Sequence, residues 1–380
     1  MRIALIGTRG VPANYGGFET CAEEIAVALA KQGHDVTAYC RYGNAKGNPA
    51  EFKGVTLVYR SCIPTKSLGT LTHTFNCILH AMRRPCDILM VFNAANSPQA
   101  LLARLFTRKA IAINVDGLEW RRRKWGLVGR TYYQFAEWLS TKVAHRVVSD
   151  SLAIMDYYKK RWMTNSTFIP YGAHVEEHRN PDIIKHYGLE PDEYFFVASR
   201  LEPENNADIT VKAFKQLKTD KKLVIAGGAN WESPFIKSIQ EEAKDDPRIR
   251  LLGPVYEPGH IPTLHTCCFA YVHGNEVGGT NPALLKAMGY GNCVLAFVDE
   301  NSPFNAEVLA GAGLLYGREP DDLLAKMQRL LDEPGLVKEL RDEARRRVSE
   351  TYTWQGVAEK YELLFKRLAS NYYRQHCECD

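Results

Sequence analysis

Apolar runs of strand length alternate with amphipathic segments of helix length along nearly the whole 380-residue chain. In the first half, helical periodicity is expected at 18–33, 70–84, 97–107, 129–143 and 151–162. Strand-like runs separate these segments, at 2–7, 35–41, 55–60, 87–92, 110–115, 145–149 and 166–169. This alternation is typical of right-handed βαβ units, which build a parallel sheet covered by helices on both faces.

The pattern restarts after a polar stretch that ends near residue 192. Further strands are expected at 194–199, 222–226, 249–252, 268–272 and 293–297, and a strong amphipathic helix at 354–370. We therefore predict an α/β protein with two Rossmann-like parallel-sheet domains, 1–172 and 173–353, and with helix 354–370 packing back on the first. Ligands of open parallel sheets bind beyond the carboxyl ends of the strands, so the active site is expected in a cleft between the domains.

Composition narrows the class of protein. The chain is 45% hydrophobic and 24% charged, which is normal for a globular protein. No run of about 18 apolar residues suggests a transmembrane helix, and the N-terminal apolar run is too short for a signal peptide. A cytoplasmic protein is therefore expected.

Charge is unevenly divided along the chain. Residues 1–172 hold 23 Lys and Arg against 11 Asp and Glu, whereas the remaining residues carry a net negative charge. A basic half suggests an anionic partner, such as a nucleic acid, an acidic membrane leaflet or a lipid diphosphate. A solvated basic surface explains the asymmetry equally well. The run Arg121–Lys124, beside Trp120 and Trp125, is a candidate interfacial patch.

Two segments of the second half carry candidate phosphate-binding chemistry. Arg200 follows the strand 194–199, where its guanidinium could neutralise a diphosphate unless it pairs with Glu202 or Glu204. The second segment is HGNEVGGTNPALLKAM, in which Pro282 is a typical first residue of a helix whose amino terminus attracts anions. Its candidate donors to a phosphate are Gly278, Gly279, Thr280 and Asn281, and Glu276 is placed to accept hydrogen bonds from sugar hydroxyls.

Two segments of the first half are further candidates. Gly16 and Gly17, in the loop after the first strand, could adopt positive φ and let a ligand approach the backbone. Asp116 ends a buried strand, where it could bind a sugar hydroxyl or stabilise positive charge at a reacting carbon. Both features are also common in ordinary turns.

The chain contains no D-x-D, G-x-S-x-G, Walker or H-E-x-x-H motif, and its cysteine pairs lack the spacing of zinc ligands. The charge of a diphosphate would then be met by Arg200 and helix amino termini. We accordingly expect no metal site and no cofactor.

These segments together resemble the GT-B glycosyltransferases of family 4. The stretches GTRGVPANYGGFET, NVDGLEW, SRLEPEN, EVGGTNPALL and YTWQGVAEKY resemble the rhamnosyltransferase branch of that family, in order, from residue 1 to about 370. The resemblance implies a retaining transferase that needs no metal. Its substrates would be a nucleotide-diphosphate sugar, such as dTDP-rhamnose, and a glycan or polyprenyl-diphosphate-linked acceptor, with no nucleic acid involved.

The resemblance also assigns roles by position. Asp116, Arg200 and Glu276 would be the catalytic residues. Gly16 and Gly17 would face the sugar and diphosphate, and Arg200 would bind the diphosphate. The distal phosphate and sugar would be cradled by Gly279, Thr280 and Asn281, and the remaining donor-binding positions would be Glu204, Gly278 and Lys286.

Two positions depart from the family pattern. Asn205 stands where relatives carry a phosphate-binding Lys, and Lys286 stands where they carry the second Glu of E-x(7)-E, which binds the ribose. A member that binds a glycan or nucleotide without catalysis is therefore one alternative, and a different two-domain enzyme, such as an epimerase or phosphorylase, is another.

Overall fold

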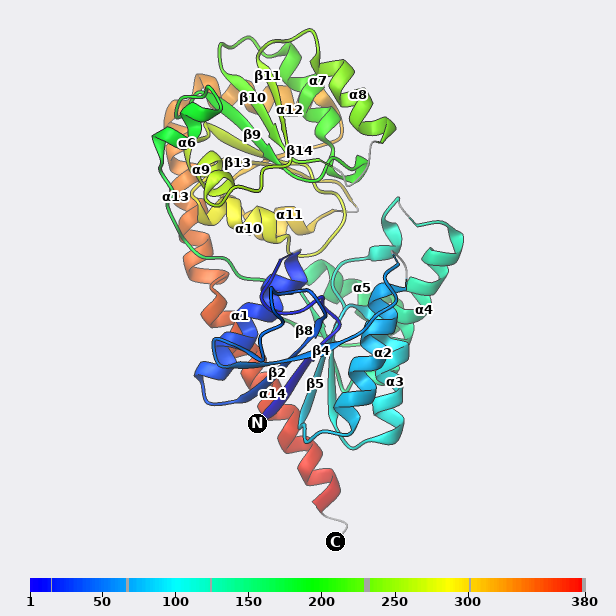
Figure 1. Cartoon of the computed structure of the whole chain (residues 1–380). Helices are drawn as coiled ribbons and strands as arrows, with labels where there is room; N and C mark the ends of the chain where they lie inside the picture. The colour runs from blue at the N-terminus through cyan, green and yellow to red at the C-terminus, as the bar shows by residue number, and fades with distance from the viewer. Residues whose placement is uncertain (15, 66–67, 124, 229–232, 301, 378–380) are drawn as a thin grey trace. The chain divides into compact units, whose positions relative to one another are not determined.

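The computed structural model describes residues 1–14, 16–65, 68–123, 125–228, 233–300 and 302–377. The chain forms two compact units (Figure 1). Unit 1 comprises Met1–Tyr171 and Trp354–Asp380, and unit 2 comprises Gly172–Thr353. The division lies one residue before the expected position, and each unit has its own buried core.

Unit 1 is built on an eight-stranded sheet in the order β3-β4-β2-β1-β5-β6-β7-β8. Every neighbouring pair is parallel except β3 and β4, which are antiparallel. The central strands β5 and β6 are buried along their whole length, as expected for a sheet covered on both faces. All of their residues are apolar except Asn114, the last residue of β6. The strands are β1 (Arg2–Ile6), β2 (Asp35–Arg41), β3 (Glu51–Phe52), β4 (Val55–Arg60), β5 (Ile88–Phe92), β6 (Ala110–Asn114), β7 (Arg146–Ser149) and β8 (Thr167–Phe168).

The helices of unit 1 form two packed groups. Helix α14 packs against α1, and α2, α3 and α4 pack side by side in that order (Figure 1). Among the described helices, none combines the length and the apolar composition that crossing a bilayer requires. The helices are α1 (Gly17–Lys31), α2 (Gly69–Met82), α3 (Ser97–Phe106), α4 (Leu127–Val143), α5 (Leu152–Trp162) and α14 (Trp354–Cys377), with short 3-10 turns at Ala94–Asn96 and Glu119–Arg121.

Unit 2 is built on a six-stranded parallel sheet in the order β11-β10-β9-β12-β13-β14. Its strands are β9 (Tyr194–Ala198), β10 (Lys222–Ala226), β11 (Ile249–Gly253), β12 (Ala270–His273), β13 (Val294–Phe297) and β14 (Leu314–Tyr316). Its helices are α6 (Pro181–His186), α7 (Ala207–Gln216), α8 (Pro234–Ala243), α9 (His260–Cys267), α10 (Pro282–Gly289), α11 (Phe304–Leu309), α12 (Pro320–Asp332) and α13 (Pro334–Thr351), with a 3-10 turn at Pro203–Asn205.

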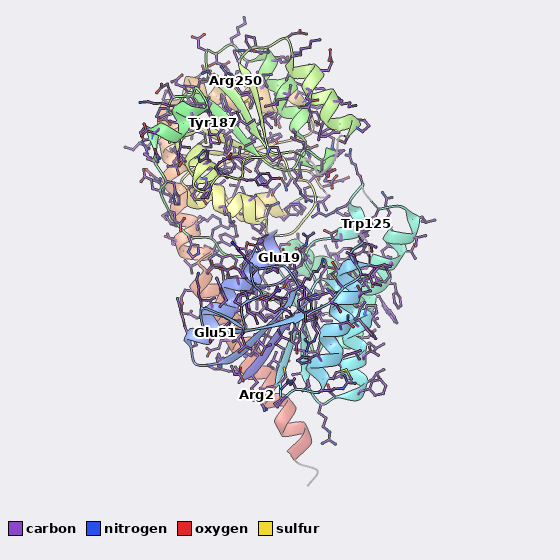
Figure 2. The ribbon with its side chains drawn as sticks, in the orientation of Figure 1. Arg2, Glu19, Glu51, Trp125, Tyr187 and Arg250 are labelled. Atoms are coloured by element: carbon purple, nitrogen blue, oxygen red, sulfur yellow. The ribbon has the colours of Figure 1, made fainter. Side chains whose placement is uncertain are left out.

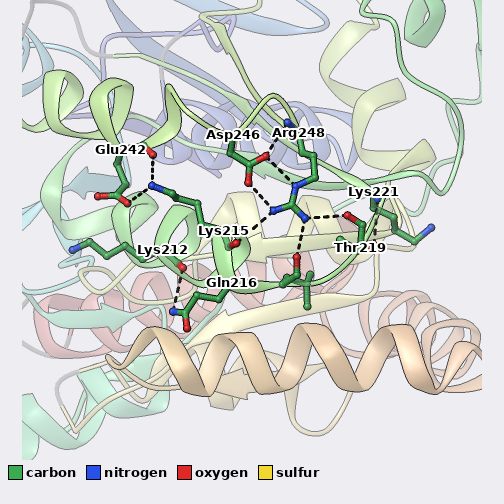
Figure 3. A network of polar contacts seen from close by, with 9 residues as sticks. Lys212, Lys215, Gln216, Thr219, Lys221, Glu242, Asp246 and Arg248 are labelled. Carbon is green, nitrogen blue, oxygen red and sulfur yellow. Dashed lines mark hydrogen bonds and ion pairs between the residues drawn. The ribbon is translucent and has the colours of Figure 1, made fainter.

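A polar network fastens the end of α7 to the start of β11 (Figure 3). The Arg248 guanidinium donates to the carboxylate of Asp246 and to the main-chain oxygens of Leu217 and Thr219, at 2.6–2.9 Å. The Lys215 ammonium pairs with Glu242 of α8 at 2.8 Å. These contacts stabilise the edge of the unit 2 sheet.

The predicted fold class is confirmed, since both units are parallel-sheet α/β structures. Two strands were not predicted. The first, β3, has two residues and the second, β14, has three, so neither is long enough to show a periodic pattern.

One carboxyl group is buried in the layer of helices that covers the unit 1 sheet. Glu137 of α4 is 3% exposed, and its Oε2 accepts a hydrogen bond from the Tyr157 hydroxyl at 3.1 Å. Burial raises the pKa of Glu137 to about 7, against the opposing effects of Tyr157, Arg121 and Arg161. The native protein therefore keeps a proton on Glu137 that the unfolded chain loses at a lower pH.

This burial gives a testable dependence of stability on pH. Because the native pKa lies above the unfolded value, Glu137 lowers the free energy of unfolding as the pH rises from about 4.5 to 7. We expect Glu137→Gln to be more stable than the wild type at pH 8, by about 2 kcal/mol, and to differ little at pH 5. Urea unfolding at both pH values measures this. Asp156→Asn, at an exposed carboxylate on α5, is the control, and an equal effect of the two variants at pH 8 would contradict the assignment.

Candidate functional site

The candidate site of unit 2 lies where its strand order reverses direction. From β9 the chain proceeds to β10 and β11 on one side, and later returns to β12, β13 and β14 on the other. The loops that follow β9 and β12 therefore diverge from neighbouring strands, and ligands of open parallel sheets bind at such a switch point. These loops hold the residues 199–206 and 274–281, which include most of the predicted phosphate-binding positions.

The two loops are joined by direct contacts. Glu276 N donates to Glu204 O at 3.0 Å, and Asn206 Nδ2 donates to Gly274 O at 2.8 Å. A Cβ atom on Gly274 would lie 2.1 Å from Asn205 O, so only glycine permits this approach of the two backbones. Neither Gly274 nor Asn206 was singled out from the sequence. The buried Glu204 contributes a main-chain oxygen to this junction.

Arg200 lies in the first loop with an exposed side chain. Its main-chain oxygen accepts a hydrogen bond from Asn205 Nδ2 at 2.7 Å. Asn205 is itself buried, so it stabilises the loop instead of replacing the missing Lys as a ligand of phosphate. The expected alternative, in which Arg200 pairs with Glu202 or Glu204, is wrong. Its guanidinium makes no ion pair within the described parts of the chain.

The second loop leads into helix α10, whose amino terminus is capped by one of the predicted phosphate-binding residues. Asn281 caps the helix through its Oδ1, which accepts a hydrogen bond from Ala283 N at 2.9 Å, and its Nδ2 amide group stays a candidate donor to a phosphate. Pro282 has no N–H group. Gly278 and Gly279 precede the cap, and their N–H groups donate to no acceptor among the described residues. The first turn of α10 contains no acidic residue, which leaves its partial positive charge for an external anion.

Glu276 has a charged partner that the sequence did not reveal. Arg318, which follows β14, contacts Glu276 Oε2 at 3.0 Å and Asp299 Oδ2 at 2.6 Å. One carboxylate oxygen of Glu276 is therefore already engaged by a cation and less available to a sugar hydroxyl. Lys286 is exposed on α10 and forms no ion pair with the described residues.

A buried histidine lies at the base of the second loop. His273 ends β12 with an exposed fraction of 1%, and its Nδ1 is 3.4 Å from the Tyr271 hydroxyl. Its Nε2 has no hydrogen-bond partner among the described residues. Burial lowers the pKa of His273 to about 3, so the ring is neutral. His273 begins the motif HGNEVGGTNPALLKAM, but the sequence pattern gave it no role.

In unit 1, the expected role of Gly16 and Gly17 as positive-φ residues is wrong. Gly16 is extended, with φ −159°, and Gly17 is the first residue of α1. The positive φ angles belong instead to Gly7 and Gly10, at 104° and 135°. A Cβ on Gly7 would lie 2.4 Å from Phe92 O, because this loop leaves the sheet at the switch point between β1 and β5.

Two glutamates of α1 hold this loop in place. Glu19 is labelled at this end of α1 in Figure 2, and its Oε1 accepts a hydrogen bond from Arg9 N at 3.0 Å. Glu23 Oε2 accepts from Ala13 N at 2.7 Å. A carboxylate thus already occupies the positive end of α1, so an external diphosphate is better accommodated at α10.

Asp116 follows β6 in the left-handed conformation, with φ 58°. Its N–H donates to Asn114 Oδ1 at 3.0 Å, and its Oδ1 accepts from the Tyr171 hydroxyl at 3.4 Å. Asn114 is in turn positioned by Tyr361 of α14, at 2.9 Å. Burial and the nearby Glu119 raise the pKa of Asp116 to about 6, although Arg122 and Tyr171 oppose the shift. Its carboxyl group therefore titrates close to neutrality.

Two asparagines after β5 were not identified from the sequence. Asn93 has φ 73°, and its Oδ1 accepts a hydrogen bond from Ala95 N. Asn96 is fully buried; its Nδ2 donates to Phe92 O at 2.7 Å, and its Oδ1 has no partner among the described residues. The stretch N-A-A-N matches no motif, so the sequence gave no sign that these two side chains bind the main chain after β5.

The basic run at 121–124 is largely used within unit 1. Arg122 pairs with Glu119 at 2.5 Å, and the Arg121 guanidinium lies 5.4 Å from the centre of the Trp120 ring. Arg123 is exposed, and Lys124 lies outside the described residues.

The described part of the chain contains no cluster of three or more His, Cys, Asp or Glu side chains suited to a metal ion.

Two family models match the chain. Residues 180–347, nearly all of unit 2, match the family described as glycosyl transferases group 1. Residues 101–174 match a domain of unknown function, DUF1972. The loops that carry Arg200 and Gly278 both fall within the first match.

Solved structures share the fold of the whole chain. Sucrose-phosphate synthase from Thermosynechococcus elongatus superimposes with a TM-score of 0.81 at 18% identity, covering 97% of this chain and 99% of that one. HepE of Anabaena, solved with UDP, gives 0.76 at 15% identity, covering 97% and 100%. A glycosyltransferase from Rickettsia africae gives 0.75 at 15%, covering 97% and 98%. Residues 180–347 of unit 2 therefore match the glycosyl transferases group 1 family, and the chain has the two-unit α/β fold of the GT-B type.

Proposed function

We propose that the protein is a retaining, metal-independent glycosyltransferase that moves rhamnose from dTDP-rhamnose to a glycan or polyprenyl-diphosphate-linked acceptor. It would act in cell-surface polysaccharide synthesis, in the cytoplasm or on the inner face of the membrane. The observation that carries the proposal is a group of candidate anion-binding residues at the unit 2 switch point. There Arg200 presents an exposed guanidinium that forms no ion pair with the described residues, and Gly278 and Gly279 present N–H groups before a helix without acidic residues in its first turn.

The chemistry follows from where charge develops during the transfer. As the bond between the anomeric carbon and the diphosphate breaks, negative charge grows on the leaving phosphate, and Arg200 with the α10 amino terminus stabilises it. The acceptor hydroxyl forms the new bond to the same carbon, and its proton passes to the leaving phosphate. The Asp116 carboxylate stabilises the positive charge that develops on the sugar. No nucleophile from the protein and no metal is then needed.

Calorimetric titration with dTDP, UDP and GDP, each with and without EDTA, tests the proposal. We expect dTDP to bind with the same affinity in both conditions, and Arg200→Ala to weaken it. Binding that EDTA abolishes would contradict the metal-independent site. Binding of UDP alone, the nucleotide found with HepE, would replace the proposed donor. Absence of binding to all three would contradict the transferase assignment.

Lys286 favours a second candidate, a protein that binds a glycan or nucleotide without catalysis. Its ammonium group is exposed on α10 at the position where the resembled family carries a ribose-binding Glu. A Lys286→Glu variant that gains turnover over an inactive wild type would support this second candidate. Turnover by the wild type would exclude it, and release of an epimerised sugar nucleotide without acceptor would indicate an epimerase.

A further inference from the structure

Large apolar side chains are exposed very unequally in the two units. Among the described residues of unit 2, only Val175 and Tyr256 are of this kind. Unit 1 has many more, and several of them lie on the neighbouring helices α3 and α4. Single exposed apolar residues need no explanation, but a contiguous group on packed helices marks an interaction surface.

Helix α4 exposes several large apolar side chains on the side away from its buried face. Its inner face, which includes Ala136, Leu139 and Val143, is buried against the core of unit 1. Its outer face exposes Phe135 and Trp138, whose rings pack 5.8 Å apart. At the amino-terminal end of the helix, Leu127 and Val128 are 82% and 85% exposed. A surface helix of a globular protein normally carries polar residues on its outer face, so this face is unusual.

Two more exposed apolar side chains lie at the carboxyl end of α3. Helix α3 packs along α4 (Figure 1), and Leu105 and Phe106 at its carboxyl end are 65% and 72% exposed. Arg104 contacts His145, which follows α4, so the carboxyl ends of the two helices lie together. We define the α3–α4 apolar face by six residues: Leu105, Phe106, Leu127, Val128, Phe135 and Trp138.

The charges around this face are all of one sign. The exposed ionisable residues of α3 and α4 are Arg104, Arg130 and Lys142. The only acidic residue of the two helices is Glu137, which is buried and whose pKa is raised to about 7. The face is therefore apolar with a cationic margin and contains no exposed carboxylate.

We propose that the α3–α4 apolar face binds the surface of an anionic lipid bilayer. In this arrangement α4 lies parallel to the membrane, with Phe135 and Trp138 among the acyl chains and Arg130 and Lys142 at the headgroups. A basic margin around aromatic and aliphatic side chains fits phosphate headgroups above a hydrocarbon layer better than it fits a second, equally basic copy of the chain. All six residues of the surface fall within residues 101–174, which match the domain of unknown function.

Vesicle binding tests the inference without donor or acceptor, so its outcome is independent of the proposed transfer reaction. The full chain is sedimented with vesicles of phosphatidylcholine alone or mixed with phosphatidylglycerol. We expect binding to the anionic vesicles only. A Phe135→Ser/Trp138→Ser double variant should bind with an affinity lower by about tenfold or more. Arg130→Gln and Lys142→Gln should each cost about fivefold, an effect that added salt reduces.

Two further measurements show whether the α3–α4 apolar face itself contacts the lipid. Trp138 is the one exposed tryptophan among the described residues, so brominated lipids should quench emission that Trp138→Phe removes. Val175→Ser/Tyr256→Ser, at the exposed apolar residues of unit 2, should bind vesicles like the wild type. Unaltered thermal unfolding of the Phe135→Ser/Trp138→Ser variant would show that it is folded. No binding by the wild type, undiminished binding by that variant, or a dimer that the variant dissociates would each overturn the inference.

Discussion

Arg200→Ala should lower kcat/KM by about 10²–10³-fold, the loss expected when one electrostatic donor to a developing charge is removed. The Arg200 guanidinium is exposed and forms no ion pair with the described residues, whereas the main chain around it is held by Asn205 and by the junction with Gly274. Its loss should therefore remove a charge from the site without unfolding the loop. Initial rates of transfer from the nucleotide sugar measure the effect.

Two variants show whether the effect arises from the charge and its position. Arg200→Lys should recover part of the rate, because an ammonium group restores the charge but not the two-pronged geometry of a guanidinium. Arg250→Ala removes another exposed arginine, from β11 of the same unit (Figure 2), and should leave kcat/KM unchanged. Equal rates for Arg200→Ala and the wild type would exclude Arg200 from the site.

The strands and the candidate loops could be located from the sequence because each depends on local pattern. The buried runs of β5 and β6 contain almost only apolar residues, which in an α/β chain is typical of central parallel strands. Arg200 lies two residues after the buried strand β9, and Gly279 lies in the loop between β12 and α10. Since parallel strands present their carboxyl ends at one edge, sequence order alone was enough to suggest that these loops share a site.

The roles of individual polar residues could not be obtained in this way, because they depend on partners distant in sequence. Glu276 pairs with Arg318, and Gly274 faces Asn205 across the switch point. Gly16 and Gly17 illustrate the converse. Glycine permits positive φ at both positions, but helix α1 begins at Gly17, one residue earlier than expected. Gly7 and Gly10 have positive φ instead.

Asp116→Asn should abolish most of the transferase activity and change its dependence on pH. The pKa of Asp116 is raised to about 6, so the wild-type rate should fall below pH 6 as the carboxylate takes up a proton. We expect the Asn variant to retain about 1% of the rate or less, with no acid limb. Tyr171→Phe removes a hydrogen bond that lowers this pKa, so it should move the acid limb to higher pH. If the Asn variant keeps the acid limb of the wild type, that limb reports the titration of a group other than Asp116.

The same substitution should make the protein more stable, which distinguishes lost chemistry from lost structure. Because the native pKa of Asp116 lies above the unfolded value near 4, the wild type loses stability as the pH rises from about 4 to 6. Asparagine carries no charge and tolerates the left-handed conformation at this position, so it avoids that loss. The side chain is only partly buried, and we expect a gain of about 1 kcal/mol at pH 7.5 and almost none at pH 4. Urea unfolding of both proteins at these pH values measures it. A variant that is inactive and also less stable at pH 7.5 would show that Asp116 supports the fold instead of the reaction.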